Sequence, residues 1–278
     1  MKKEAFQHQL LSWYAINKRD LPWRKTTNSY KILVSEIMLQ QTQVNRVIDY
    51  YKRFLKQFPT VEVLANAKTA AVIKAWAGLG YNRRAVLLQK CAQAIQGKRF
   101  PKTPEALEDL PGIGPYTAAA VASFAHNRDV GVVDTNVIRV LSRLFYGVEN
   151  AKKEEITTLA QEIVPKKKSR IWNNAIMDFG AMICASIPQC SSCPFAKQCP
   201  ALKNGFPQGQ SKAKQPAFEG STRQVRGQII AILRKTHSIS VAELARKLQK
   251  PASKVQLVTK KLATDGLAVI KKKTISLP

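Results

Sequence analysis

Four cysteines lie within sixteen residues, as Cys184-x5-Cys190-x2-Cys193-x5-Cys199, and this cluster is the strongest constraint on the fold of the 278-residue chain. Such a density of thiols without a secretion signal indicates a metal site rather than a disulfide framework. Four thiolates suit either zinc or a cubane iron–sulfur cluster, and two CxxC knuckles would favour zinc. A single CxxC with longer segments on both sides predicts a loop that wraps one metal centre. The fifth cysteine, Cys91, lies in the apolar run LLQKCAQAI and is expected to be a buried thiol.

The chain carries a formal net charge of +27, which is unusual for a metabolic enzyme because like charges repel one another. Both parts of the chain are basic. Residues 200–278 hold 16 Lys or Arg against 3 Asp or Glu, and the remainder holds 29 against 15. Solubility alone needs a much smaller charge. The composition therefore predicts a polyanionic partner, with nucleic acid as the first candidate.

Neither a membrane span nor a secretion signal is evident in the sequence. No run of about 18 apolar residues exists, and the N-terminus, MKKEAFQHQLLSWY, lacks an apolar segment followed by a cleavage site. We therefore expect a cytoplasmic protein without a membrane partner, associated with the nucleoid if its partner is DNA.

Helical periodicity dominates the first 200 residues, and a composition change at residues 203–220, rich in Gly, Pro, Gln and Lys, predicts an exposed linker. The periodic runs include 50–58, 69–77 and 117–125. Beyond the linker, the pattern predicts helices over 223–235, 241–248 and 253–264, followed by a hairpin of LAVIK and TISL. Ser240 and Ser253 are candidate N-caps, and Gly266 is a candidate helix stop. This order is typical of a winged-helix domain, which binds DNA or serves protein contacts.

The segment LPGIGPYTAAAV, at residues 110–121, places Gly112 and Gly114 in a tight turn before an Ala-rich helix. Without Cβ atoms, these glycines let backbone N–H groups approach a phosphate at the helix N-terminus. The turn therefore predicts a non-specific phosphate clamp, although a GxG turn alone is equally typical of an ordinary helix connection.

Two carboxylates are candidates for chemistry at a glycosidic bond. Asp134 opens an amphipathic helix, so it is a candidate N-cap that can also stabilise an oxocarbenium-like sugar. Glu36 lies in SYKILVSEIMLQQTQV, a helix that is apolar nearly all round and is therefore expected to be buried. Burial raises the pKa of a carboxyl, so Glu36 can remain protonated near neutral pH and act as a general acid. The simpler alternative is a Glu paired with a neighbouring Arg.

These features jointly resemble the MutY family of adenine DNA glycosylases, within the endonuclease III superfamily, over residues 5–200. The motifs that carry the resemblance are LPWR at 21–24, Glu36-x2-Leu39-Gln40-Gln41-Thr42, GLGY at 78–81, LPGIGPYT, VDTNV and the four cysteines. The resemblance implies DNA with an extruded base between two helical domains and a 4Fe-4S cluster on the cysteines.

The resemblance implies an all-α, helix-hairpin-helix DNA glycosylase fold, and the C-terminal pattern adds a small α+β winged-helix domain. The glycosylase core covers residues 1–202. Within it, 21–130 form a six-helix barrel, while 1–20 and 131–202 form the iron–sulfur domain. The linker at 203–220 then leads to the winged helix at 221–278.

The resemblance also implies roles for single residues. Glu36 matches the general acid, Asp134 the carboxylate that stabilises the oxocarbenium, Tyr116 a contact to the reacting centre and Asn136 a nearby polar partner. Because Tyr116 stands where strand-cleaving relatives carry a nucleophilic Lys, we expect base removal without strand cleavage. The positions that match DNA or base contacts are Trp23 and Arg24 in the adenine pocket, Gln41 and Tyr81 in the duplex wedge, and Thr42, Gly112, Gly114 and Asp178.

The chain departs from the family pattern at four points, of which the first, in the cysteine spacing, is expected to leave cluster binding intact. The spacing between Cys184 and Cys190 is one residue shorter than usual, Asp178 stands where adenine readers typically carry Glu, and VDTNV replaces VDGNV. The fourth is the winged helix, which replaces a Nudix-like domain that inspects 8-oxoguanine.

The expected function is that of a monomer that removes adenine mispaired with 8-oxoguanine or guanine from double-stranded DNA containing a mismatch or oxidised base. A thymine or uracil glycosylase acting opposite guanine is the alternative. A DNA-binding regulator with an iron–sulfur centre and a winged helix is a third possibility, but it leaves both carboxylates without roles.

Overall fold

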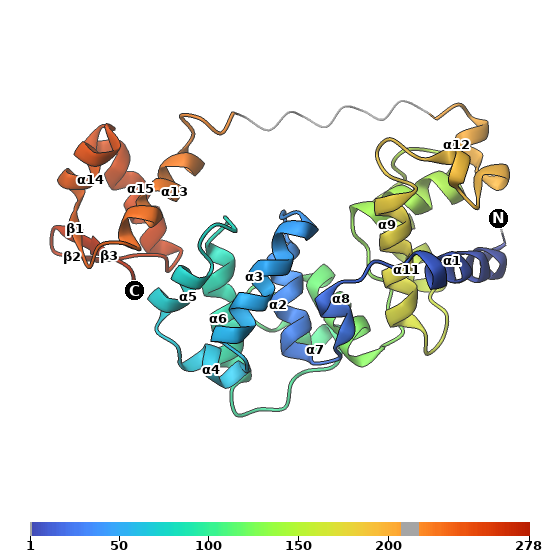
Figure 1. Ribbon diagram of the computed structural model, residues 1–278, viewed down its shortest axis with the longest axis horizontal. Coiled ribbons are helices and arrows are strands. Elements are labelled where there is room, and N and C mark those ends of the chain that lie inside the picture. Colours follow the sequence, from blue (N-terminus) through green and yellow to red (C-terminus); the bar gives the residue numbers. More distant parts are fainter. Residues whose placement is uncertain (1, 207–216) are drawn as a thin grey trace. The chain divides into compact units, whose positions relative to one another are not determined.

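The structure, a computed structural model, describes residues 2–206 and 217–278, and it is almost entirely helical up to residue 206 (Figure 1). This confirms the predicted all-α class of the chain up to residue 202. No helix among the described residues is long and apolar enough to cross a bilayer. Most of the linker predicted at 203–220 falls on residues 207–216, which lie outside the described part of the chain.

The helices of the core are connected by short turns. Their bounds are α1 Lys3–Asn17, η1 Pro22–Lys25, α2 Ser29–Leu39, α3 Val44–Gln57, α4 Val61–Asn66, α5 Thr69–Ala75, α6 Arg83–Ile95, α7 Pro104–Glu108, α8 Pro115–His126, α9 Thr135–Leu141, η2 Ser142–Tyr146, α10 Lys153–Glu162, α11 Ser169–Met182, η3 Cys190–Ser192, η4 Ala196–Gln198 and α12 Pro200–Lys203. The three periodic runs named from the sequence fall in α3, α5 and α8, as predicted.

The described chain divides into two compact units. The first unit holds residues 2–36, 100–109 and 113–206, and the second unit holds residues 37–99, 110–112 and 217–278. The domain bounds expected from the sequence, at residues 20, 130 and 202, stay predictions.

Aromatic packing organises the first unit. In α1, Phe6, Leu10 and Tyr14 recur every four residues and so form one buried stripe along the helix. Phe6 makes an edge contact with Trp172 of α11, with ring centroids 5.5 Å apart, and its ring centroid lies 5.1 Å from that of Phe195. The first helix therefore completes a core whose other members lie at residues 137–201, late in the sequence of this unit. Figure 1 shows α1 lying beside α11.

Helices α9 and α11 of the first unit approach closely at Gly180. A Cβ at this position would lie 2.7 Å from Cβ of Asn136 and 3.1 Å from Cγ2 of Val140. Only glycine therefore allows this approach without a shift of one helix. The contact brings the start of α9, where Asp134 lies, against the helix that carries Asp178.

The helices of the second unit pack around Trp76, which is fully buried. Its ring makes an edge contact with Phe54 of α3, with centroids 5.7 Å apart. Cys91 of α6 is also fully buried, and burial raises the pKa of its thiol to about 12. The expectation of a buried thiol is confirmed.

The C-terminal part of the second unit, residues 217–278, forms a small α+β domain with the element order expected for a winged helix. Its elements are α13 Thr222–Leu233, β1 Ile239–Ser240, α14 Val241–Leu248, α15 Ala252–Thr264, β2 Val269–Lys271 and β3 Thr274–Ser276. The predicted hairpin pairs Ile270 with Ile275 in an antiparallel sheet of order β1-β3-β2. The sequence analysis missed β1, because a two-residue strand leaves no periodicity to detect.

The side chains of Ser221 and Ser240 cap α13 and α14. Ser240 accepts a hydrogen bond from the backbone N–H of Glu243 at 3.1 Å and caps α14, as predicted. The proposed cap at Ser253 is wrong, because α15 begins at Ala252 and Pro251 occupies its N-cap position. Proline fixes φ near the value that a helix start requires, so the helix begins earlier than the serine. Gly266 takes a left-handed φ of 71° just after α15, which fits the predicted stop.

Within the second unit, the C-terminal domain packs against α5 and α6. Ile73 and Val86 belong to the same buried cluster as Leu262 and Ile275 of the domain. The backbone N–H of Ala70, in the first turn of α5, donates a hydrogen bond to the carbonyl oxygen of Pro278 at 3.2 Å. Asp265 pairs with Arg83 of α6 at 3.5 Å and with Arg226 of α13 at 2.6 Å. The domain is therefore held to these helices by apolar packing, a backbone bond and an ion-pair network.

Candidate active site

A buried carboxyl on α2 lies against a tyrosine at the start of α8, and both belong to the first unit. Glu36 is 4% exposed, and its Oε2 accepts a hydrogen bond from the hydroxyl of Tyr116 at 3.2 Å. Burial raises the pKa of Glu36 to about 7, the Tyr116 bond opposes the rise, and the charge of Asp134 adds to it. The burial and raised pKa predicted from the apolar helix are thus both present, and Glu36 is a carboxyl that holds a proton near neutral pH.

Asp134 caps α9 and is held by two donors. Its Oδ1 accepts from the backbone N–H of Val137 at 2.8 Å, and its Oδ2 accepts from the amide nitrogen of Asn136 at 2.8 Å. Burial raises the pKa of Tyr116 well above its usual value, and the charges of Glu36 and Asp134 raise it further. The structure therefore brings together Glu36, Tyr116, Asp134 and Asn136, as the sequence analysis proposed.

Arg139, which the sequence analysis did not single out, supports this cluster from the next turn of α9. Its Nη2 donates to the side-chain oxygen of Asn136 at 2.7 Å and to the carbonyl oxygen of Gly180 at 2.6 Å. Its Nε donates to the carbonyl oxygen of Cys184 at 2.7 Å. A chain of hydrogen bonds therefore runs from the first cysteine of the cluster through Arg139 and Asn136 to Asp134.

Asp178 of α11 is fully buried in an ion-pair network with two arginines. Arg24 donates from Nη1 to Oδ2 at 2.5 Å and from Nη2 to Oδ1 at 2.7 Å, while Arg19 donates from Nε to Oδ1 at 2.6 Å. The backbone N–H of Arg19 adds a bond to Oδ2 at 3.1 Å. Although burial acts to raise it, these bonds and charges hold the pKa of Asp178 below its usual value. Both oxygens thus position arginines, and Trp23, beside Arg24, is buried.

The glycine turn is split between two conformations. Gly112 has a left-handed φ of 77°, and a Cβ there would lie 2.7 Å from Cβ of Leu87, so this position requires glycine. Gly114 has an extended backbone and occupies the N-cap position of α8, with Pro115 as the first helical residue. Both glycines are exposed, which leaves the helix start accessible to a phosphate.

Two exposed residues of the second unit, Gln41 and Tyr81, have positive φ values of 56° and 47°. Arg84, 8% exposed, ties their loops together, and the sequence analysis missed it. Its guanidinium donates to the carbonyl oxygens of Ile37 and Gly80 at 2.8 and 3.1 Å, and also to those of Met38 and Gln40 and to Oγ1 of Thr42. Strained backbone held by such a network is typical of residues fixed for a function.

All four clustered cysteines line one apolar cavity of the first unit. The cavity has a volume of about 20 Å³, and Leu144, Phe179 and Ile183 are among its other lining residues. Among the described residues, no three His, Cys, Asp or Glu side chains converge closely enough to hold a single metal ion. The four cysteines share this one lining and are the residues that could hold a metal centre here.

Comparison with known proteins gives the family of the chain. A family model described as HhH-GPD superfamily base excision DNA repair protein matches residues 34–166. The protein named adenine DNA glycosylase of Mycolicibacterium smegmatis is 39% identical over 268 residues, which cover 93% of this chain and 91% of that protein. The chain belongs to the adenine DNA glycosylase family. The human member of this family is 42% identical over 71% of this chain, and the match spans 39% of the human protein.

Solved structures also match this adenine DNA glycosylase family member. A thermostable thymine-DNA glycosylase aligns with a TM-score of 0.68 and 33% identity, covering 73% of this chain and 97% of its own. Endonuclease III in a trapped covalent complex with DNA aligns with a TM-score of 0.64 and 24% identity, covering 74% and 100%, which shows the fold alone. The predicted helix-hairpin-helix glycosylase fold is confirmed.

Proposed function

We propose that this chain is a monofunctional DNA glycosylase of base excision repair that hydrolyses the N-glycosidic bond of adenine mispaired with 8-oxoguanine or guanine. The observation that carries the proposal is the pair of unlike carboxylates, one buried beside Tyr116 and one held by Asn136. Two carboxyl groups in different environments allow one to give a proton while the other stays ionised.

The proposed first step is protonation of the leaving base by Glu36. Its pKa of about 7 leaves a large protonated fraction at neutral pH, and the Tyr116 hydroxyl fixes the orientation of the carboxyl. Protonation turns the base into a better leaving group as the bond to the sugar stretches. Positive charge then accumulates on the sugar. Asp134, oriented by Asn136 and the Val137 N–H, is proposed to stabilise that charge until water adds to the sugar. The proton that this water loses is proposed to return to the Glu36 carboxylate, which restores the acid.

Strand cleavage is not proposed. A lyase of this superfamily needs an amine nucleophile that forms an imine with the sugar, and the matching position holds Tyr116. Incubation with substrate DNA and borohydride should therefore trap no stoichiometric covalent complex. A covalent complex trapped in an amount equal to that of the DNA-bound enzyme would contradict the monofunctional assignment.

We propose that the four cysteines hold a 4Fe-4S cluster, which would tie the loop of residues 184–199 to α9 and α11. The common apolar cavity and family membership support this assignment. The role of this chain's own residues is to shield the centre, with Phe179 and Leu202 among the cavity walls. Protein purified without oxygen should absorb near 400 nm, and zinc in place of iron by elemental analysis would contradict the assignment.

A panel of duplexes tests the substrate. The four duplexes carry adenine opposite 8-oxoguanine, adenine opposite guanine, thymine opposite guanine and uracil opposite guanine. We expect base release from the first two. Cleavage confined to the last two would instead assign the chain to thymine or uracil excision, which the 33% identity to a thymine-DNA glycosylase makes the specific alternative.

We further propose that the enzyme acts as a monomer on nucleoid DNA.

A further inference from the structure

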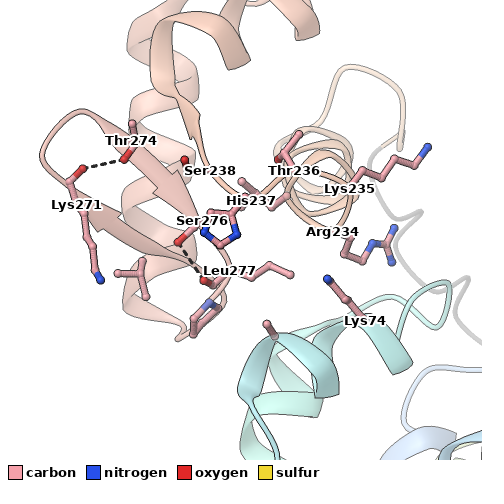
Figure 2. Close-up of a pocket in the computed structure, with 14 residues that line it drawn as sticks. Lys74, Arg234, Lys235, Thr236, His237, Ser238, Lys271, Thr274, Ser276 and Leu277 are labelled. Carbon is pink, nitrogen blue, oxygen red and sulfur yellow. Dashed lines mark hydrogen bonds between the residues drawn. The ribbon is translucent and has the colours of Figure 1, made fainter.

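A basic pocket of about 540 Å³ lies within the second unit, between α5 and the C-terminal domain. Figure 2 shows Lys74 and Arg234 extending toward the same opening from opposite walls, while Lys235 and Lys271 project outward at its sides. The wall formed by the domain also carries Thr236, His237, Ser238, Thr274 and Ser276. This pocket is separate from the carboxylate cluster, which belongs to the first unit.

The pocket carries an excess of positive charge. No Asp or Glu lines it, and none of its four Lys and Arg side chains forms an ion pair with a residue that the structure describes. A free carboxylate at Pro278 would offset one of the four charges. Like charges that face a common space repel one another, and a bound anion would remove the repulsion.

The walls of the pocket are fixed by the packing that joins the domain to α5 and α6. Ile73, one residue before Lys74, is fully buried in the cluster shared with the domain. Leu233, one residue before Arg234, is 1% exposed in the same cluster. Because the neighbours of both cations are anchored in one core, the two charges are held at the same opening by the fold.

The chemistry of the pocket fits phosphodiesters better than a small anion. A single phosphate would fill only part of the space, whereas a strand can present successive phosphates to the four cations. Hydroxyl groups such as that of Ser238 complement Lys and Arg in backbone contacts to DNA. Such contacts position a protein on the duplex and carry no base information.

We infer that this pocket binds the sugar–phosphate backbone of duplex DNA outside the lesion, as a second anchoring site. The inference rests on the proposed function, since it assigns a further contact to the same DNA substrate. The C-terminal domain then contributes to DNA binding together with Lys74 of α5, through a composite surface that neither wall provides alone.

The test is the salt dependence of binding to an undamaged 30-base-pair duplex, measured with the 278-residue chain between 50 and 200 mM salt. The pocket variant is Lys74→Gln/Arg234→Gln. The matched control is Lys90→Gln/Arg99→Gln, which also removes one Lys and one Arg, both exposed in the second unit and outside the pocket. Each lost phosphate contact lowers the slope of log affinity against log salt by about 0.9.

We expect the slope of the pocket variant to fall by about 1.8 in magnitude, with a loss of affinity at each salt concentration, while the control keeps the wild-type slope. Lys74→Arg/Arg234→Lys, which keeps both charges, should retain most of the slope. Urea unfolding of each variant shows whether it is folded. An unchanged slope in the folded pocket variant, or an equal fall in the control, would overturn the inference.

A second arm separates DNA from a free phosphate. Inorganic phosphate is titrated at constant ionic strength while the amide signals of residues 236–238 are followed by NMR. Duplex DNA should shift these signals at protein-equivalent concentrations, whereas inorganic phosphate should need a large excess. Saturation by phosphate with no response to duplex would overturn the inference in favour of a small-anion site. Since the duplex contains no lesion, either result is independent of whether the enzyme releases adenine.

Discussion

Arg139 donates a hydrogen bond to the side-chain oxygen of Asn136 at 2.7 Å, and this bond fixes which end of the amide faces Asp134. With its oxygen occupied by Arg139, the Asn136 amide presents its nitrogen to Oδ2 of Asp134. The orientation of the proposed charge-stabilising carboxylate therefore depends on an arginine that is itself anchored on carbonyl oxygens of Gly180 and Cys184.

Arg139→Gln should lower the single-turnover rate of adenine release by about 10- to 100-fold, because a small displacement of a catalytic group is enough for such a loss. Affinity for product duplex should stay near the wild-type value. Arg139→Lys, which keeps the charge without the planar guanidinium, should release adenine at a rate between those of the wild type and Arg139→Gln. A wild-type rate in folded Arg139→Gln would show that Asp134 needs no support from this residue.

Residues whose chemistry is local are recognisable in the sequence, whereas residues whose partners are distant are not. The N-cap at Asp134 and the buried helix around Glu36 follow from spacing within one segment. Arg84 and Arg139 lie on amphipathic helices, where an arginine usually extends to solvent. Their acceptors are mostly backbone carbonyls, which every residue carries, so no sequence pattern marks them. The one local signal is at Arg139, which is flanked by apolar residues on both sides in VIRVL and so is expected to lie partly buried.

The partners of Asp178 could not be predicted from the sequence for the same reason. Its buried position in AIMDFGAMIC was compatible with a base contact, but Arg19 and Arg24 come from a segment more than 150 residues away. The general fold was accessible because helix breaks and the cysteine spacing are sequence features. The attachment of the C-terminal domain to α5 and α6 could not be predicted from the sequence, because it depends on surface complementarity between Ile73, Val86 and that domain.

Glu36→Gln should abolish base release while stabilising the protein at alkaline pH. The folded-state pKa of about 7 lies above the unfolded value of 4.5, so the folded protein binds the extra proton between these values. Below pH 4.5 the carboxyl is protonated in both the folded and the unfolded state, so it does not lower the free energy of unfolding. As pH rises through 7, it lowers the free energy of unfolding by up to about 3 kcal/mol, and glutamine at this position avoids that loss.

Urea unfolding at pH 5 and pH 8.5 measures this change. The stability advantage of Glu36→Gln over the wild type should be small at pH 5 and on the order of 2–3 kcal/mol at pH 8.5. In the wild type, the rate of base release should fall as pH rises above about 7, because the general acid loses its proton. A rate that rises steadily to pH 9 would contradict a protonated Glu36.

Arg84→Met should destabilise the protein by about 3 kcal/mol or more, because several buried carbonyl oxygens would lose their donor together. Methionine keeps much of the apolar stem, so the change isolates the lost hydrogen bonds. Arg83→Met, at the exposed neighbouring position, is the matched control and should cost under about 1 kcal/mol. Equal unfolding midpoints for the two variants in urea would argue against the role of Arg84 in joining its two loops.

Asp178→Asn should cost about 3–5 kcal/mol in unfolding free energy, since it leaves the charges of Arg19 and Arg24 without their buried partner. Asp178→Glu keeps the charge but must fit an extra methylene into a fully buried site, so about 1–3 kcal/mol is expected. Thermal unfolding monitored by circular dichroism gives both values. The order of the two variants is the sharper test, because reversal would mean that volume outweighs charge at this position.

The position of α1 in the core of the first unit has a consequence for biosynthesis. Phe6, Leu10 and Tyr14 leave the ribosome well before Trp172 and Phe195, which lie some 160 to 190 residues further along the chain and against which this stripe packs. At a synthesis rate of about 5–20 residues per second, the apolar stripe stays without its partners for roughly 10–40 s. During this interval the nascent helix exposes a surface suited to a chaperone, and the unit closes only when its last segment has emerged.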